Sequence, residues 1–407
     1  MAGNMTLRLA PPLTAWQALA LLAALAAPVA SRPEARSTAS EYISTVCADY
    51  GTAYGPLVES YLSQFQGGFS TADILQLPAM YNGSRLQREY GGAATLLYIL
   101  DGEVLYDSSL PQPGGKRLKN LEYFGIPVLQ QLAQLAVLPD LVIRHSPFDE
   151  PLHFTGVDAA PWAGYCMVPQ QQRMLLLPDT LRQASLQCLG SCQAGPLDTR
   201  KPEAVFLGTP TGWEKGKRKA VLRAGLQRPE RVYSGLIGDP GGLLSPDEAR
   251  VFQLHPPLPL HDQVAQYKYV VNVEGNCAAL RLKYLLAGPS AVFFVQSDEI
   301  EWFYPLLKPF VHYIPVTFRR TGVEEEFEVD LAEKVAWAEK NPDSIQRIVR
   351  AANLFAKRYL SKQGQQCFAM QMLDRYARML RDPWRLRKLR HRAEQVVGLM
   401  ANTSALP

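Results

Sequence analysis

The sequence predicts an α/β protein in which two Rossmann-like domains face a cleft. Short apolar runs typical of buried strands alternate with helix-like segments in two stretches of the chain, one before residue 195 and one after residue 204. After Val329 the pattern is helical, so we expect the last helices to pack back across the joint. The pattern alone also fits one doubly wound sheet with insertions.

Length and composition narrow the class of protein. With 407 residues the chain has room for two or three domains, and its 47% hydrophobic and 20% charged residues are ordinary for a globular protein. The formal net charge of +4 is small, which argues against nucleic-acid binding because that function needs concentrated basic charge. A modest positive charge suits an anionic ligand but does not by itself indicate one.

Residues 1–30 have the pattern of a signal peptide. Arg8 precedes the apolar run Trp16–Val29, and small residues lead up to Ala30. The run is short and well punctuated for a membrane span, so we expect cleavage after Ala30 rather than retention as an anchor. This pattern predicts the lumen of the secretory pathway, in the endoplasmic reticulum or Golgi, with membrane contact only if the segment stays uncleaved.

The six cysteines are expected to form disulfides in that oxidising compartment. Their spacing does not determine the pairing, although Cys188 and Cys192 are close enough in sequence to close a small loop. Zinc binding is the alternative, but no histidine stands nearby at ligand spacing, so we expect no metal. Glycosylation sequons at Asn82 and Asn402 fit secretion.

The first domain is predicted over residues 31–195. Asp101-Gly102 is its clearest turn signal, because this dipeptide favours the tight turn of a β-hairpin. Its predicted elements in chain order are a helical stretch at Glu41–Phe65, a hairpin at Ala94–Tyr106, a helix at Leu121–Leu138, and strands at Leu141–Arg144 and Arg173–Leu177.

The second domain is predicted over residues 196–345, and a helical tail over residues 346–407. The polar stretch Gln193–Lys201 is the candidate crossing between the two domains. Strands are predicted at Ala204–Leu207, Tyr267–Val273 and Ala291–Val295, and helices at Cys277–Leu286, Leu331–Glu339, Pro342–Gln363, Cys367–Leu380 and Trp384–Met400.

Two adjacent acids, Asp149 and Glu150, follow the strand Leu141–Arg144. Loops at strand ends are where α/β folds place catalytic groups, and a carboxylate in a cleft is suited to take a proton from a hydroxyl. Adjacent acids more often cap a turn or face solvent. The pattern alone therefore favours capping or solvation over a catalytic role.

A second candidate site combines the loop Gly208–Gly212 with the turn Glu274-Gly275-Asn276. Glycines and hydroxyls after a strand cradle a diphosphate through backbone N–H groups, although many such turns bind nothing. Arg281 has the planar donor fork that grips a diphosphate, and a surface ion pair is its simpler explanation. Glu301 either accepts hydrogen bonds from ribose hydroxyls or is the acid at a helix N-terminus.

Several short motifs cluster between Tyr267 and Val316. They are Glu274-Gly275-Asn276, Arg281, Leu285-Leu286 with Ser290, Glu301-Trp302-Phe303, and Pro309-Phe310-Val311-His312-Tyr313-Ile314-Pro315-Val316. In this order they resemble glycosyltransferase family 90, which includes fungal capsule-associated β-xylosyltransferases and animal protein O-glucosyltransferases. The resemblance is clear from roughly Asp140 to Cys367.

The resemblance implies the GT-B architecture and an inverting transfer of a sugar, xylose or glucose, from a UDP-sugar to a hydroxyl of a protein or glycan. It implies that Asp149 is the general base and that Cys47 pairs with Cys367. No Asp-x-Asp element occurs in the sequence, which argues against a metal-dependent transfer, so we expect no metal or other cofactor. The expected donor-binding residues are Gly208, Thr209, Thr211, Gly212, Arg218, Glu274, Gly275, Asn276, Arg281 and Glu301.

Two departures from the family pattern concern the donor loop. Leu207 and Pro210 stand where relatives often carry arginines, so Arg281 must meet the phosphate charge. The candidates to assist it are Lys215, Lys217, Arg218 and Arg223. A non-catalytic member that binds a nucleotide sugar or glycan is therefore the main alternative. A glycosidase is the third, but adjacent acids such as Asp149 and Glu150 point to opposite sides of a strand and flank one bond poorly.

Overall fold

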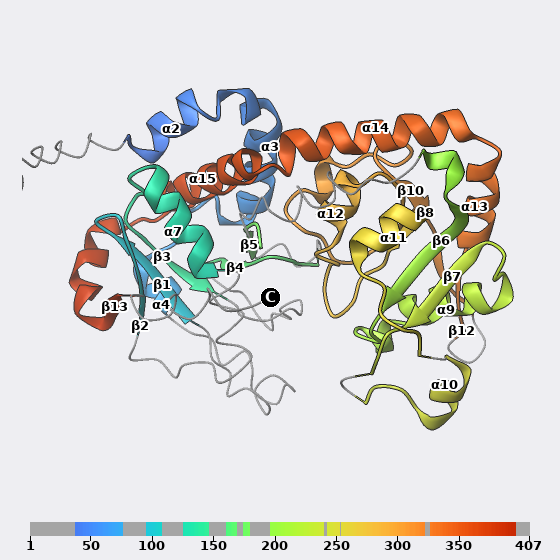
Figure 1. The fold of residues 1–407 in the computed structure, drawn as a ribbon. Helices are drawn as coiled ribbons and strands as arrows, with labels where there is room; N and C mark the ends of the chain where they lie inside the picture. Colours follow the sequence, from blue (N-terminus) through green and yellow to red (C-terminus); the bar gives the residue numbers. More distant parts are fainter. Residues whose placement is uncertain are drawn as a thin grey trace, which may run out of the picture. The chain divides into compact units, whose positions relative to one another are not determined.

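Two β-sheets and their helices organise the part of the chain that the computed structural model describes (Figure 1). The described residues after Ser37 belong to one compact unit, Thr38–Pro407. No helix within the described ranges is both long and apolar enough to cross a membrane. These ranges are 37–75, 95–107, 125–145, 160–168, 174–179, 196–239, 242–252, 254–321 and 326–395.

The first sheet is mixed, with the strand order β13-β2-β1-β3-β4-β5. Its strands are β1 (Thr95–Leu100), β2 (Glu103–Asp107), β3 (Leu141–His145), β4 (Trp162–Gly164), β5 (Met174–Leu176) and β13 (Ala393–Gln395). The strands β3, β4 and β5 run parallel, whereas β1 is antiparallel to both β2 and β3.

This sheet departs from the Rossmann-like pattern that the sequence predicts for the first domain. The predicted hairpin explains why, because Leu100 pairs with Glu103 and a two-residue connection joins only antiparallel strands. Asp101 and Gly102 both have positive φ, 51° and 78°, as a tight hairpin turn requires. The predicted hairpin is therefore confirmed, and it makes the first sheet mixed rather than purely parallel.

The second sheet is parallel throughout, with the order β10-β9-β8-β6-β7. Its strands are β6 (Lys201–Gly208), β7 (Val232–Leu236), β8 (Tyr267–Asn272), β9 (Ala291–Val295) and β10 (Ile314–Val316). The chain adds β7 on one side of β6 and then β8, β9 and β10 on the other. The direction of winding thus reverses between β6 and β8, which is the topological switch point where open α/β sheets bind ligands.

Helices lie between the parallel strands in the sequence, namely α9 (Lys217–Gln227), α10 (Pro246–Val251), α11 (Leu260–Gln266) and α12 (Leu282–Ala287). Helix α13 (Leu331–Glu339) follows the last of these strands and contacts β6, β7 and β10. The sheet core between them is apolar, and every residue of β9 is buried. Buried runs of this kind are typical of parallel strands that are covered on both faces.

The helical tail contacts elements of both sheets. Helix α14 (Pro342–Tyr359) packs on α12 and β9, and α15 (Lys362–Arg378) packs on α2 (Ala39–Thr45) and α3 (Gly51–Leu62). The Tyr376 hydroxyl donates a 2.7 Å hydrogen bond to the carbonyl of Val142 in β3. The predicted Cys47–Cys367 disulfide is present and fastens the segment after α2 to α15.

The predicted helix Trp384–Met400 is wrong over its described part. Residues Pro383–Arg392 form a 3₁₀ segment, and Ala393–Gln395 form β13, which pairs with β2. An edge strand offers unpaired N–H and C=O groups that capture such a segment. Arg390 reinforces the capture through contacts of 2.8 Å to Asp101 and 2.6 Å to Glu103.

Candidate functional site

The candidate site lies at the carboxyl ends of β6 and β8, on either side of the switch point. Strand β6 leads into the loop Gly208–Gly212, and β8 leads into the turn Glu274-Gly275-Asn276. The two segments lie more than 60 residues apart in sequence, yet the Gly212 N–H donates a 2.9 Å hydrogen bond to the Asn276 side-chain oxygen. The structure therefore brings together the two glycine-containing segments that the sequence singles out.

Two facing glycines make this approach possible. A Cβ added to Gly212, which has a φ of +66°, would lie 2.1 Å from the Gly275 carbonyl oxygen. A Cβ added to Gly275 would lie 2.7 Å from both the Arg218 guanidinium and the Thr211 hydroxyl. A side chain at Gly212 would push the two backbones apart, whereas one at Gly275 would displace the Arg218 and Thr211 side chains.

Arg281 reaches across both strands of the switch point. Its guanidinium donates to the Val271 carbonyl at the end of β8, at 2.8 Å, and to the Leu207 carbonyl at the end of β6, at 3.4 Å. The same group lies 4.9 Å from the centre of the Phe206 ring. No described carboxylate forms an ion pair with Arg281.

Arg218, on the first turn of α9, points to the same place. It donates to the carbonyls of Thr209, at 2.5 Å, and Glu274, at 3.0 Å, and lies 5.8 Å from the Phe206 ring centre. Burial lowers the pKa of Arg218 to about 10, and burial together with the Arg218 charge lowers the pKa of Arg281 to about 9. Burial thus disfavours the charged form of both groups, and the nearby charge of Glu274 offsets this in part for Arg218.

The helix that carries Arg281 is shorter than the sequence predicts. Helix α12 begins at Leu282, and Arg281 is its N-terminal cap, so the expected helical start at Cys277 is wrong. The Gly275 N–H donates to the Cys277 carbonyl, which forms a tight turn in place of the first helical turn. This turn leaves Arg281 beside the strand ends.

Two lysines of the same region are neutralised by acids. Lys217 contacts the buried Glu274 carboxylate at 3.0 Å and Asp298 at 2.7 Å. Lys215 contacts Glu299 at 2.5 Å and donates to the Asn276 carbonyl at 2.8 Å. The Glu274 side chain, a predicted donor-binding group, is thus already engaged by a lysine.

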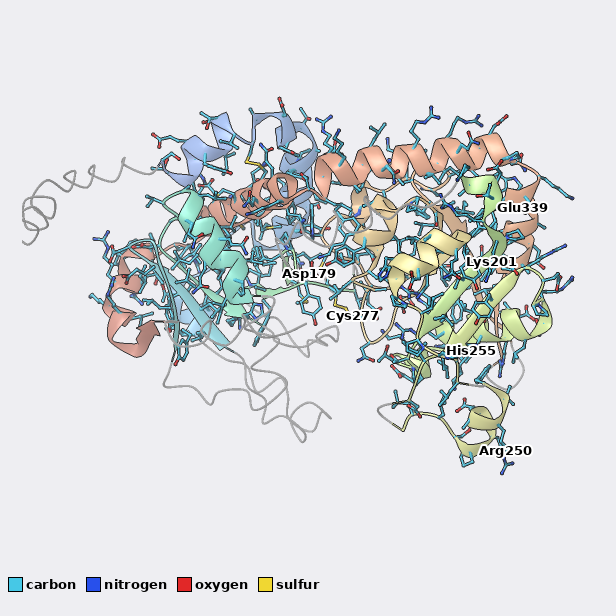
Figure 2. The ribbon with its side chains drawn as sticks, viewed as in Figure 1. Asp179, Lys201, Arg250, His255, Cys277 and Glu339 are labelled. Carbon is cyan, nitrogen blue, oxygen red and sulfur yellow. A yellow bond between two sulfur atoms is a disulfide. The ribbon has the colours of Figure 1, made fainter. Side chains whose placement is uncertain are left out.

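Glu301 is buried near the charged side chains of Asp179 and Lys283. Its side chain is 1% exposed, and burial followed by the nearby charge of Asp179 raises its pKa well above the ordinary value. Asp179 in turn forms a buried ion pair with Lys283 of α12 (Figure 2 labels Asp179). This ion pair was missed by sequence reasoning, since no local pattern links residues about a hundred positions apart.

A cavity of about 180 Å³ opens beside the two facing glycines. Its wall combines Thr211 of the loop Gly208–Gly212, residues of the turn after β8, and Tyr165, which directly follows β4 of the first sheet. It is lined by Tyr165, Thr211, Arg218, Gly275, Asn276, Cys277, Ala278, Ala279 and Leu280. The first-sheet residue in this wall was not predicted, because nothing near Tyr165 in sequence marks a site.

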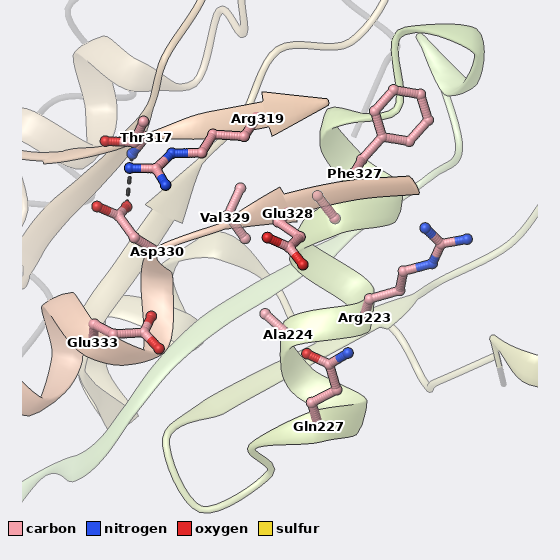
Figure 3. Close-up of a pocket in the computed structure, with 11 residues that line it drawn as sticks. Arg223, Ala224, Gln227, Thr317, Arg319, Phe327, Glu328, Val329, Asp330 and Glu333 are labelled. Carbon is pink, nitrogen blue, oxygen red and sulfur yellow. Dashed lines mark hydrogen bonds between the residues drawn. The ribbon is translucent and has the colours of Figure 1, made fainter. Parts of the chain in front are cut away.

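A separate cavity of about 350 Å³ lies between α9 and the hairpin of β11 (Phe318–Thr321) and β12 (Glu326–Val329) (Figure 3). Its lining carries both charges, with Arg223 and Arg319 beside Glu328 and Glu333. None of the predicted donor-binding residues lines it. We therefore place the candidate site at the switch point.

The predicted residues fall into three groups. Thr211, Gly212, Arg218, Gly275, Asn276 and Arg281 come together, and the Gly208 and Thr209 carbonyls accept hydrogen bonds from Ile237 and Arg218. Glu274 and Glu301 are buried among their own partners. Asp149 and Glu150 lie outside the described residues, as do Cys188, Cys192 and both sequons.

Comparison with known proteins gives a consistent picture. The chain is 28% identical to Protein O-glucosyltransferase 3 of Mus musculus over 70% of this chain and 55% of that protein. It is 30% identical to the O-glucosyltransferase rumi homolog of Aedes aegypti over 45% of this chain and 43% of that protein. A shorter match, to Protein O-glucosyltransferase 2 of Danio rerio, is 39% identical over 28% of this chain and 21% of that protein.

The matched part of the chain spans about half the length of these relatives or less. The model of glycosyl transferase family 90 matches residues 188–403, which is more than half of the chain and includes the whole switch point. The motifs between Tyr267 and Val316, the facing glycines and the two arginines all lie inside this match. The chain therefore belongs to glycosyl transferase family 90.

Proposed function

We propose that this protein is an inverting glycosyltransferase that moves a sugar, glucose or xylose, from a UDP-sugar to a hydroxyl of a protein or glycan acceptor. The observation that carries the proposal is the pair Arg218 and Arg281, which donate hydrogen bonds to main-chain carbonyls and form no ion pair with a described acid. A diphosphate would give both guanidinium groups a direct anionic partner, in addition to the Glu274 charge that acts on Arg218.

The proposed donor site uses the geometry of the switch point. The diphosphate binds between Arg218 and Arg281, and the Thr211 hydroxyl and the backbone of the Gly208–Gly212 loop approach it closely because Gly212 and Gly275 have no side chains. Negative charge grows on the leaving UDP during transfer. Fixed arginines stabilise that charge, so we propose that the reaction needs no metal.

Asp149 is the proposed general base, on the strength of the family resemblance of the Asp149-Glu150-Pro151 segment. The acceptor oxygen attacks the anomeric carbon, the bond from that carbon to the UDP oxygen breaks, and the acceptor proton moves to the Asp149 carboxylate. One displacement of this kind inverts the anomeric centre. The proposal includes the GT-B arrangement and a place in the secretory lumen, which the two disulfides support.

UDP release tests the proposal most directly. Wild-type protein is incubated with several UDP-sugars, with and without protein and glycan acceptors, beside the variants Asp149→Asn and Glu150→Gln. We expect release with at least one donor, abolished by Asp149→Asn and retained by Glu150→Gln, while UDP binding measured by calorimetry stays near wild type in both. Absence of UDP release with every donor and acceptor would contradict an enzymatic role.

A non-catalytic binding role is the second candidate. Leu207 and Pro210 occupy positions where the family often has arginines, and Leu207 is buried and offers only its carbonyl to Arg281. A reduced set of cations can suffice to bind a nucleotide sugar without sufficing to stabilise the departing UDP. Tight UDP binding by wild type without turnover would favour this candidate.

A further inference from the structure

A disulfide that sequence reasoning did not assign crosses the candidate site. Cys166, two residues after β4 of the first sheet, is bonded to Cys277 in the turn after β8 of the second, and their Cα atoms are 6.3 Å apart (Figure 2 labels Cys277). Cys277 and Tyr165, the neighbour of Cys166, both line the 180 Å³ cavity that also contains Arg218. The covalent link therefore belongs to the wall of the site.

The segment around Cys166 is fastened at a second point. The Met167 N–H donates to the Ile300 carbonyl at 3.1 Å, and the Ile300 N–H donates back to the Met167 carbonyl at 2.8 Å. Tyr165 and Cys166 are 4% and 2% exposed. The first-sheet side of the cavity is thus buried, and hydrogen bonds to Ile300 hold the segment that carries Cys166 in place.

The turn that holds Cys277 is fastened on its opposite side to the donor loop. Asn276 accepts hydrogen bonds from the Gly212 N–H through its side chain and from Lys215 through its carbonyl. The Glu274 carbonyl accepts from Arg218. The turn is therefore held between the loop Gly208–Gly212 on one side and Cys166 on the other.

We propose that the Cys166–Cys277 disulfide is a positioning element of the donor site. It holds Tyr165 against the Gly275–Cys277 turn, so that the pocket has its ligand-binding shape before a nucleoside diphosphate arrives. A preformed pocket binds more tightly because less conformational freedom is lost on binding. Reduction by a dithiol transfers two electrons and two protons, leaves two thiols and weakens binding. This inference rests on the proposed donor site.

The second disulfide provides a matched control. Cys47 and Cys367 are both fully buried, and their bond joins the segment after α2 to helix α15. Neither residue lines the cavity beside Arg218. Removal of this bond also takes away one covalent crosslink, but it leaves the wall of the donor site intact.

The test compares Cys166→Ser/Cys277→Ser with Cys47→Ser/Cys367→Ser. Calorimetric titration with UDP is expected to show affinity about threefold to tenfold weaker for the first variant and near wild type for the second. Wild type reduced with dithiothreitol should weaken by the same factor and recover after reoxidation with oxidised glutathione. This reversible arm does not depend on whether the serine variants fold.

Hydrogen exchange separates this inference from the proposed function. We expect faster exchange of the amides between 274 and 282 in Cys166→Ser/Cys277→Ser, and no such change in the control variant, whether or not UDP binds. If wild type fails to bind UDP, the proposed function is wrong while the exchange result still reports on positioning. The inference would be overturned if reduced wild type or Cys166→Ser/Cys277→Ser matched wild type both in hydrogen exchange and in UDP affinity.

Discussion

Four cations stand at the carboxyl edge of the parallel sheet, and they form two contrasting pairs. Lys215 and Lys217 contact the carboxylates of Glu299, Glu274 and Asp298. Arg218 and Arg281 instead donate to main-chain carbonyls, and no described acid forms an ion pair with either. Acids contact the lysine pair within the fold, whereas no described acid lies at ion-pair distance from the arginine pair.

The difference shows that a count of basic residues does not locate an anion site. All four side chains come from segments that the sequence marks as basic or close to glycine turns. What separates them is whether a carboxylate lies within ion-pair distance. The lysines are accordingly assigned to stability and the arginines to ligand binding, and this assignment can be tested one residue at a time.

The largest expected effect is the loss of a buried ion pair on the lysine side. Lys217→Ala leaves the Glu274 carboxylate, which is 2% exposed, without its closest cation. We expect the free energy of unfolding to fall by up to about 3 kcal/mol, since breaking a buried pair is costly and Lys215, 4.0 Å from Glu274, compensates the buried charge only in part. Chemical denaturation measures it.

Lys219→Ala is the control for this prediction, because its pair with Glu248 is more exposed and surface pairs contribute about 1 kcal/mol or less. Replacing both Lys217 and Glu274 by methionine should recover much of the loss. If Lys217→Ala and Lys219→Ala lower the free energy of unfolding equally, the ion pairs of Lys217 contribute no more to stability than a surface pair does.

The next effect is on ligand affinity from the arginine side. Arg281→Ala should weaken UDP binding by at least about tenfold, because a charge-assisted hydrogen bond contributes roughly 1.5–3 kcal/mol. Arg281→Lys should recover only part of the affinity, since a point charge does not reproduce the planar fork. Calorimetric titration of UDP compares the variants.

Arg223→Ala is the matched arginine control, as this residue lies on α9 but lines the other cavity. Its affinity for UDP should equal that of wild type. If Arg281→Ala also binds like wild type, Arg281 is structural, and the Gly208–Gly212 loop or the Lys215–Lys219 run holds the diphosphate.

A smaller effect concerns the pH dependence of the Lys215–Glu299 pair. Burial, followed by the charge of Glu274, raises the pKa of Glu299 to about 7 from an ordinary value of 4.5. The folded protein therefore keeps this proton at pH values where the unfolded chain has lost it. Its contribution to stability is present below the ordinary value and is lost as the pH rises toward 7.

We expect the stability difference between wild type and Glu299→Gln to change across this window by at most about 1.4 kcal/mol per pH unit. Thermal or chemical unfolding at pH 5, 6 and 7.5 measures the difference, in which the titration of other groups cancels. A difference that stays constant with pH would mean that Glu299 is ionised throughout.

The smallest expected effect is that of a chelator. Because arginines are proposed to carry the charge of the leaving diphosphate, transfer activity should be unchanged in EDTA. UDP release with and without the chelator, followed by added Mg²⁺ or Mn²⁺, measures it. A complete loss that a metal restores would show that the two arginines do not suffice.

Local sequence patterns predicted most strands of the second sheet. The strands at β6, β8 and β9, the glycine turns beside them and Arg281 were all identified from apolar runs and turn residues. The hairpin at Asp101-Gly102 was equally clear, because its turn chemistry is local. Cys47–Cys367 followed from family resemblance, since spacing alone leaves the pairing of cysteines open.

Contacts between residues far apart in the chain could not be predicted from the sequence, for a physical reason. The conversion of residues 393–395 into a strand depends on the free edge of β2, and the shortening of α12 depends on the turn at Cys277. Local propensities cannot report either partner, because contacts with distant parts of the chain outweigh them.

The sequence by itself thus determined the α/β class, the strands of the parallel sheet and the residue types available for an anion site. Tertiary structure alone decided that the chain reverses its winding between β6 and β8, that Gly212 meets Gly275, and that Cys166 bonds to Cys277. It also decided which cations have acids beside them. Charge compensation acts over a few ångströms in space, and the sequence does not specify which distant residues come within that range.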